Sequence, residues 1–182
     1  MQRHIHPLSS QTIPEDRFAS LLQHSLAAVL RGAQDGNLPL FTWTLGLPQQ
    51  QLLTMLAELF PELANGLEPL PNTQYAHLLA TTPVEFGDLV SMLCARCTPT
   101  SDSRYSEWLA RVLAAASLGD RRLWENMELR NRKELDDLLA TCFLPLYRDN
   151  SANLGWKHFL LTELAKSKKP DAPHPTQNQH DD

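Results

Sequence analysis

Residues 105–119, Tyr-Ser-Glu-Trp-Leu-Ala-Arg-Val-Leu-Ala-Ala-Ala-Ser-Leu-Gly, decide the fold class of this chain. Apolar side chains recur there every three or four residues, a spacing that places them on one face of an α-helix. Gly119 follows the last of them and favours termination of the helix. The members of this face are Tyr105, Trp108, Leu109, Val112, Leu113 and Ala116. A short helix with one such face is stable only when other helices cover it.

Matching faces occur on both sides of this stretch. They are Phe18, Leu21, Leu22, Leu26, Val29 and Leu30; Leu52, Met55, Leu56, Leu59 and Phe60; Phe86, Leu89, Val90, Leu93, Cys94 and Cys97; Leu123, Trp124 and Met127; Leu135, Leu138, Leu139, Cys142 and Phe143; and Trp156, Phe159, Leu160 and Leu164. Gly32 is expected to lie just past the end of the first helix, and Asn131 with Glu134 to start the helix of residues 135–143. No segment alternates with the period of a strand. The sequence therefore predicts an all-α, single compact domain of about six or seven short helices in an orthogonal or irregular array.

Composition sets the domain boundaries. Residues 61–82 are rich in Pro, Asn, Gly and Thr, which predicts a loop with at most a short turn of helix at Tyr75–Ala80. Residues 166–182 contain almost nothing that can be buried, and we expect a disordered C-terminal tail there. The prediction is a helical domain over 12–165, preceded by a flexible N-terminus over 1–11.

Charge and cysteine usage exclude several classes of function. The 182 residues carry a formal net charge of -5, so general attraction to nucleic acid is not expected. The longest uncharged run, residues 36–57, contains prolines and glycine and does not resemble a membrane span. Three cysteines do not suggest a disulfide framework and favour a cytoplasmic location.

Few residues of this sequence suggest a catalytic or ligand-binding site. The basic residues Arg121, Arg122, Arg130, Arg132 and Lys133 alternate with glutamates and are interpreted as a solvated helix face. Asp136 and Asp137 are adjacent, and neighbours on a helix point in different directions, so they are poor acid–base partners. Motifs of nucleophilic hydrolases, zinc proteases and nucleotide-binding loops are absent, so an enzyme is not expected.

Three cysteines are the candidate metal ligands. Cys94 and Cys97 form a C-x-x-C at the end of a predicted helix, and Cys142 could join them. A zinc site would need further ligands, and a redox role would need the thiols at a helix start. The other interpretation is that the cysteines are small buried apolar residues.

Four segments appear in an order that resembles a known family. They are Leu123-Trp124-Glu125-Asn126-Met127-Glu128-Leu129, Phe143-Leu144-Pro145-Leu146, Asn150, and Gly155-Trp156-Lys157-His158-Phe159. This order resembles the NifQ family of nitrogen-fixation proteins, from about residue 84 to 164. The resemblance implies molybdenum handling or delivery for biosynthesis of the nitrogenase iron–molybdenum cofactor, with cofactor-assembly proteins as partners.

The resemblance also implies a molybdenum–iron–sulfur cluster, held by a C-x4-C-x2-C-x5-C group after the W-K-x-F segment. After Phe159 this sequence contains no cysteine, so none of those ligands can be carried over. Substitute ligands, a cluster shared with a partner, or a degenerate member that serves as a helical protein-interaction module remain open. A zinc-stabilised domain using the three cysteines is a third hypothesis.

Three residues match the family and remain candidates for contact with a partner or an anion: Trp124, Trp156 and Lys157. Lys157 is expected to face solvent, where it could meet an acidic partner or an anion such as molybdate. The tryptophans are expected either to pack in the core or to mark a partner surface.

Overall fold

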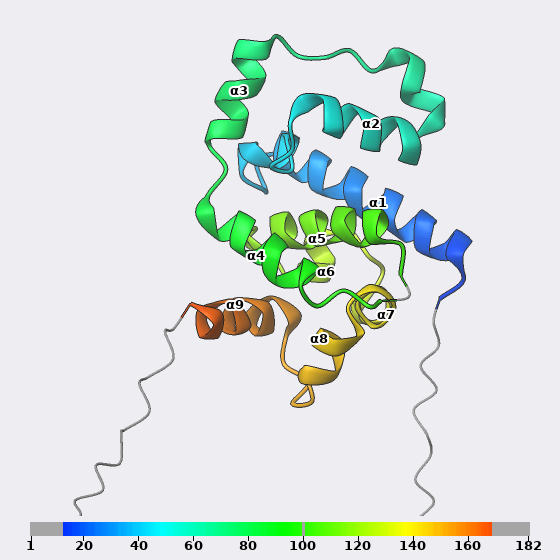
Figure 1. Ribbon diagram of the computed structural model, residues 1–182, viewed down its shortest axis with the longest axis vertical. Helices are drawn as coiled ribbons and strands as arrows, with labels where there is room; N and C mark the ends of the chain where they lie inside the picture. Colours follow the sequence, from blue (N-terminus) through cyan, green and yellow to red (C-terminus); the bar gives the residue numbers. More distant parts are fainter. Residues whose placement is uncertain (1–12, 100, 169–182) are drawn as a thin grey trace, which may run out of the picture.

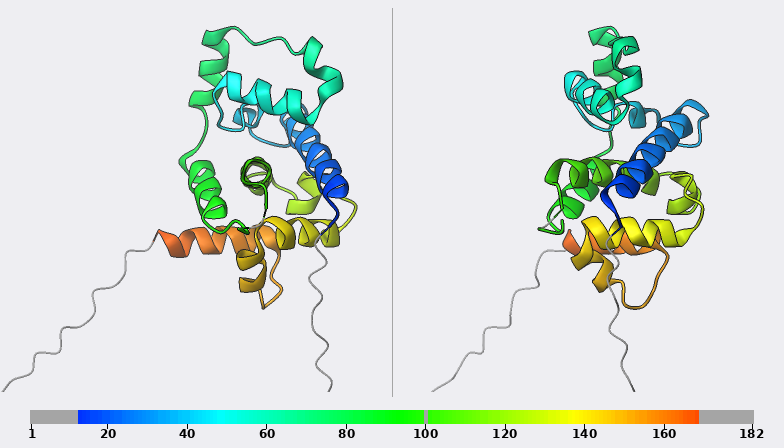
Figure 2. Two further views of the ribbon diagram at one scale, coloured as in Figure 1. Left: turned by 45° about the vertical axis from the view of Figure 1, so that its right-hand side comes forward. Right: turned by 90° about the vertical axis from the view of Figure 1, so that its right-hand side faces the viewer.

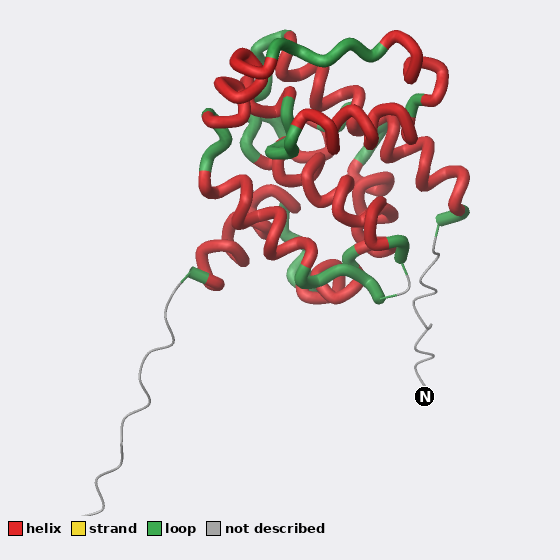
Figure 3. Tube along the Cα trace, turned by 45° about the horizontal axis from the view of Figure 1, so that its top comes forward, coloured by secondary structure: helices red, strands yellow, loops and turns green. Residues whose placement is uncertain are grey.

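The computed structural model of the chain describes residues 13–99 and 101–168, which form helices and loops without a strand (Figures 1 and 3). The elements are α1 (Glu15–Gln34), η1 (Leu40–Trp43), α2 (Gln49–Leu59), η2 (Pro61–Gly66), α3 (Asn72–Ala80), α4 (Val84–Cys94), α5 (Ser103–Ser117), α6 (Leu123–Asn126), α7 (Arg132–Cys142), α8 (Leu144–Asp149) and α9 (Trp156–Ser167). The η elements are short 3-10 helices. Over the described residues, the predicted all-α fold is confirmed. The expected flexible N-terminus and residues 169–182 of the expected tail lie outside them.

Helix α5, whose sequence pattern indicated the fold class, lies at the centre of the molecule. The left view of Figure 2 looks nearly along α5 and shows α1 and α4 on its two sides. A run of alanines, residues 114–116, is fully buried and allows the neighbouring helices to approach closely. Asp102 caps the helix, because its Oδ1 accepts a hydrogen bond from the backbone N–H of Arg104 at 2.8 Å.

The first helix is longer than predicted. α1 runs through Gly32 to Gln34, so the expected end at Gly32 was wrong. A Cβ atom on Gly32 would lie 3.0 Å from Cδ1 of Leu38, which shows that this glycine permits close packing of the returning chain. Gly36, with φ of +74°, has the left-handed conformation that follows many helix ends.

Residues 61–82 contain more helix than the predicted loop. η2 occupies Pro61–Gly66, and α3 runs for nine residues instead of a short turn. The side chain of Tyr75 is buried, and its hydroxyl donates a hydrogen bond to the backbone oxygen of Leu47 at 2.7 Å. This contact with a distant segment stabilises α3, and local composition could not reveal it.

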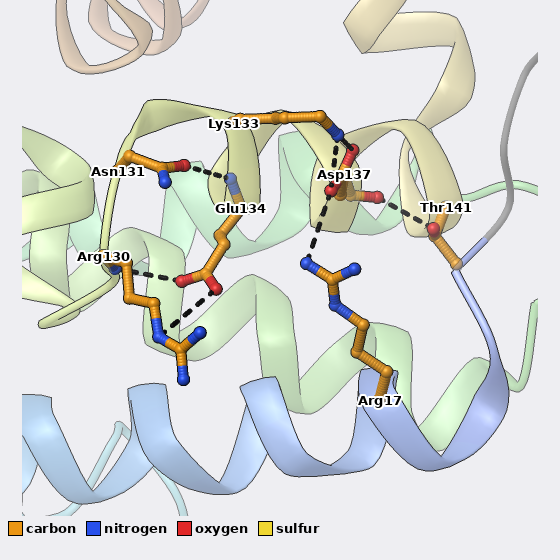
Figure 4. Close-up of polar contacts among 7 residues, drawn as sticks. All are labelled: Arg17, Arg130, Asn131, Lys133, Glu134, Asp137 and Thr141. Atoms are coloured by element: carbon orange, nitrogen blue, oxygen red, sulfur yellow. Dashed lines mark hydrogen bonds and ion pairs between the residues drawn. The ribbon is translucent and has the colours of Figure 1, made fainter.

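Polar contacts fix the start and orientation of α7 (Figure 4). Asn131 Oδ1 accepts a hydrogen bond from the backbone N–H of Glu134 at 3.2 Å, which confirms the predicted start of this helix. The carboxylate of Glu134 accepts in turn from the backbone N–H of Arg130 at 2.9 Å. One turn further on, Asp137 Oδ2 lies 3.9 Å from Nη2 of Arg17 and links α7 to α1.

The last helix includes the first two residues of the predicted tail. α9 ends at Ser167, and Lys166 pairs with Glu163 within it at 2.8 Å. Across the described part of the chain, none of the helices combines the length and the apolar character needed to cross a membrane.

Candidate functional site

A groove of about 700 Å³ lies between α6, α7 and the first turn of α9. Its apolar lining is Leu123, Trp124, Leu135, Trp156 and Leu161. Its charged or ionisable lining is Asp120, Arg121, Arg122, Arg132, Lys157 and His158. A hollow of this size, mostly apolar with a few polar groups, is typical of a ligand-binding or peptide-binding site.

The three residues predicted to contact a partner or an anion all line this groove. Trp124 and Trp156 come from α6 and α9, and Lys157 follows Trp156 in the first turn of α9. The segments are about 30 residues apart in the chain. They meet because α9 packs against α4 with its first turn facing α6 and α7 across the groove. Their role in binding stays a prediction, but their common location is established.

Trp156 has a well-defined packing environment. Its ring stacks on Tyr147, with centroids 5.9 Å apart, and meets Phe159 edge-on at 5.7 Å. Its indole N–H donates a hydrogen bond to Asp136 Oδ1 on α7. Trp156 is buried, whereas Trp124 is half-buried, so Trp124 offers the more accessible ring.

Lys157 does not face solvent as predicted. Its side chain is half-buried, and its ammonium donates a hydrogen bond to the backbone oxygen of Gly119. The physical reason is that a backbone oxygen partly removed from water needs a hydrogen-bond donor, and the oxygen of Gly119 lies outside α5, where no helical N–H can supply one. Gly119 lies two residues past the end of α5, so Lys157 secures α9 against that end.

The basic residues do not form a single helix face, so that interpretation was wrong. Arg121 and Arg122 precede α6 and are exposed at the groove. Arg132 lies at the start of α7, where its Nη2 donates to Asn153 Oδ1 at 2.6 Å and to the backbone oxygen of Leu154 at 2.9 Å. Arg130 and Lys133 do not line the groove.

The adjacent carboxylates of α7 point to different surroundings, as expected. Asp136 faces Trp156 and lies 3.6 Å from Nε of Arg132. Asp137 pairs with Lys133 at 2.9 Å (Figure 4). They do not form an acid–base pair.

The three cysteines lie at the ends of α4 and α7. The backbone N–H of Thr98, beside Cys97, donates to the backbone oxygen of Cys142 at 2.7 Å, which shows that these helix ends meet. Burial raises the pKa of Cys94 and Cys142 to about 11, and it raises the pKa of Cys97 as well. Burial thus favours the thiol over the thiolate at all three positions, and a metal bound there would have to displace the thiol protons.

The described residues contain no group of three or more His, Cys, Asp or Glu side chains placed to hold a metal ion. The role of Cys94, Cys97 and Cys142 as ligands stays a prediction. The apolar packing of Cys142, which is 2% exposed, agrees with the other interpretation of a small buried residue.

Sequence reasoning missed part of the groove. It did not select Arg121, Arg122, His158 or Leu161 as site residues, although two of them directly precede Leu123-Trp124 and one follows Lys157. Proximity to the selected segments was the available signal. Whether these side chains point into the groove depends on how α6 and α9 pack.

Comparisons with known proteins agree on one family. The NifQ family model matches residues 22–172. Protein NifQ of Azotobacter vinelandii is 30% identical over 167 residues, which cover 87% of this chain and 82% of that protein. Protein NifQ homolog of Sinorhizobium fredii is 26% identical over 160 residues, which cover 83% of this chain and 61% of that protein. Protein NifQ of Rhodobacter capsulatus is 38% identical over 60 residues, or 32% of this chain and 33% of that protein. No solved structure matches the chain.

Proposed function

Because this chain belongs to the NifQ family, which supports a function related to nitrogen fixation, we propose that it takes part in molybdenum handling or delivery for biosynthesis of the nitrogenase iron–molybdenum cofactor. The observation that carries the proposal is that two segments that resemble the family, residues 123–129 and 155–159, both contribute to the same groove, the first through Leu123 and Trp124 and the second through residues 155–158. In this proposal the chain is a carrier or binding protein and not an enzyme.

The chain's own residues do not fit a cluster held by four thiolates. The sequence has three cysteines, two of them with a pKa near 11, and residues 160–182 contain none. We therefore derive no step through a cluster on this chain alone. Molybdenum is the cargo of the proposed pathway, and a cofactor-assembly protein that receives or supplies it is the proposed partner.

A complementation experiment tests this function. The full chain would be produced in a nitrogen-fixing bacterium that lacks its own NifQ, and acetylene reduction would be measured over a range of molybdate concentrations. We expect the chain to restore nitrogenase activity when molybdate is scarce and to make little difference when it is abundant, because a supply factor matters when supply is limiting. Accumulation of folded chain without any restoration at low molybdate would contradict the proposal.

Metal analysis separates a carrier from the second candidate, a helical protein-interaction module. The protein would be purified without oxygen after production with iron, sulfide and molybdate. Bound molybdenum supports a carrier. A metal-free protein that still complements the strain supports the interaction module, for which the exposed groove beside Trp124 is the specific observation.

A further inference from the structure

The groove combines a buried apolar base with a basic rim. Leu123, Leu135 and Trp156 are at most 4% exposed, while Arg121 and Arg122 are exposed. Protein interfaces are commonly arranged in this way, with an apolar centre, a charged edge, and tryptophan and arginine among the residues that contribute most to binding.

The cations of the groove fall into two groups. Lys157 and Arg132 already donate hydrogen bonds to Gly119, Asn153 and Leu154, so they shape the wall. The side chains of Arg121 and Arg122 make no ion pair with any residue of the described ranges 13–99 and 101–168. These two arginines are therefore available to an external anion.

The charge of this groove is opposite to that of the whole chain. The lining contains four cations, counting lysine and arginine, against the single carboxylate of Asp120. One of the four, Arg132, pairs with Asp136 outside the lining, and the groove remains positive whereas the chain has a formal net charge of -5. An acidic partner would be repelled by much of the remaining surface and attracted to this groove.

We propose that the groove docks a short peptide segment of a partner protein, with apolar side chains over Leu123, Trp124 and Leu161 and acidic side chains beside Arg121 and Arg122. The inference rests on the proposed function for the identity of the partner, but the chemistry of the segment follows from the groove. Acidic residues set the orientation and speed of association, and the apolar residues supply most of the affinity.

A small oxyanion fits the observations less well. A four-oxygen anion needs several donors that converge on one point, whereas Lys157 and Arg132 are already paired inside the protein. The volume of about 700 Å³ also lies in the range of pockets that enclose much larger ligands.

Selection from a peptide library tests the proposal although the partner is unidentified. A phage-displayed library of random 12-residue peptides would be selected on the immobilised full chain, and synthetic copies of the enriched peptides would be titrated by fluorescence anisotropy. We expect enriched sequences with Asp or Glu next to Leu, Phe or Trp. We also expect their affinity to fall as salt is raised.

Matched variants locate the binding. The double variant R121Q/R122Q should weaken binding of the enriched peptides by about tenfold, because two exposed ion pairs are lost. The control R130Q/K133Q removes the same charge outside the groove and should change binding less than about twofold. Likewise, L161S should weaken binding, whereas V84S, which removes an exposed apolar side chain from α4, should not. Circular dichroism would confirm that each variant is folded.

Four results would overturn the proposal. One is the absence of enrichment, or enrichment of peptides without acidic residues. Another is equal binding to R121Q/R122Q and R130Q/K133Q. The third is calorimetric binding of molybdate that R121Q/R122Q abolishes while no peptide binds, which would assign the groove to a small anion. The fourth uses a peptide of residues 169–182, titrated in the same way. If it binds more tightly than the enriched peptides, the occupant of the groove is the chain's own C-terminal segment and not a partner protein. If the chain binds the enriched peptides but fails the complementation experiment, this inference stands and the proposed function is rejected.

Discussion

The ammonium of Lys157 donates a hydrogen bond to the backbone oxygen of Gly119, and this contact joins the first turn of α9 to the segment that follows α5. The contact also explains why a lysine that looked like a surface residue is half-buried.

Removing this ammonium should destabilise the protein. We expect K157M to lower the free energy of unfolding by about 1–2 kcal/mol, because the Gly119 oxygen loses a charged donor. Urea denaturation followed by circular dichroism measures the change. The exposed neighbour His158 provides the control, since H158A should alter stability by less than about 0.5 kcal/mol. Equal effects of both substitutions would show that the Lys157 contact is not stabilising.

Gly119 should not tolerate a methyl group. A Cβ atom there would lie 2.3 Å from Cδ2 of Leu38 and 2.7 Å from Nδ2 of Asn126, so G119A should cost about 1–3 kcal/mol of stability. At Gly87, within α4, such a Cβ would have no atom within 4 Å apart from its chain neighbours and the backbone of its own helix. G87A should therefore stabilise the helix by about 0.5–1 kcal/mol. Thermal unfolding of both variants checks that the melting temperature falls for G119A and rises for G87A. A higher melting temperature for G119A would contradict the packing described around Gly119.

The cap of α7 gives a third prediction. Asn131 accepts a hydrogen bond from the backbone N–H of Glu134, so N131A should lower the free energy of unfolding by about 1 kcal/mol. N131D keeps an acceptor oxygen and should remain within about 0.5 kcal/mol of the unsubstituted chain. The two variants would be compared in urea, and similar losses for both would argue against a capping role.

The thiols should react slowly in the folded protein. With a pKa of about 11, Cys94 and Cys142 are about one part in a thousand thiolate at pH 8, so alkylation by iodoacetamide should be more than about 100-fold slower than in denaturant. Mass spectrometry of peptides from timed reactions measures the rate at each cysteine. Rapid alkylation at pH 8 in the native state would contradict the raised pKa values.

The raised pKa values of Cys94 and Cys142 also make the stability of the protein depend on pH. The folded state raises the pKa of these thiols above their ordinary value of 9.0, so it favours the protonated form. Their contribution to stability is therefore complete below about pH 9 and is lost as pH rises toward about 11. The midpoint of urea denaturation should fall as the pH is raised from 8 to 11, and the midpoint of the C142A variant should fall less steeply over that range.

The melting temperature should not respond to a chelator. No described group of three or more His, Cys, Asp or Glu side chains is placed to hold a metal ion, so treatment with EDTA should leave thermal unfolding unchanged. Differential scanning calorimetry before and after dialysis checks this. A clear loss of stability that zinc restores would support the zinc-stabilised domain instead.

Most of the fold could be predicted because helical periodicity is a local property. The faces around Leu109, Leu135 and Phe159 were each visible within about three turns of sequence, and they are buried in the structure. The end of α1 and the whole of α3 could not be predicted in this way. Gly32 is used for contact with Leu38, and Tyr75 is held by Leu47, so both depend on partners outside the local segment.

The candidate site was only partly accessible to sequence reasoning. The order of the Leu-Trp and Trp-Lys segments identified Trp124, Trp156 and Lys157, because that order resembles a family. Their assembly into one groove, and the presence of Arg121 and Arg122 at its rim, depended on tertiary packing that places the first turn of α9 opposite α6 and α7. The expected location of Lys157 was wrong because the acceptor at Gly119 is 38 residues away in the chain.

By itself, the sequence determined that this chain is helical, where most helices lie, which family it resembles, and that residues 160–182 contain no sulfur donors. These properties depend on residue type and on spacing over a few turns. Only the tertiary structure decided which cations are paired, which thiols are buried, and which tryptophan remains accessible. Those properties depend on contacts between residues that are far apart in the chain, and such residues lie near one another only in the packed arrangement of the helices.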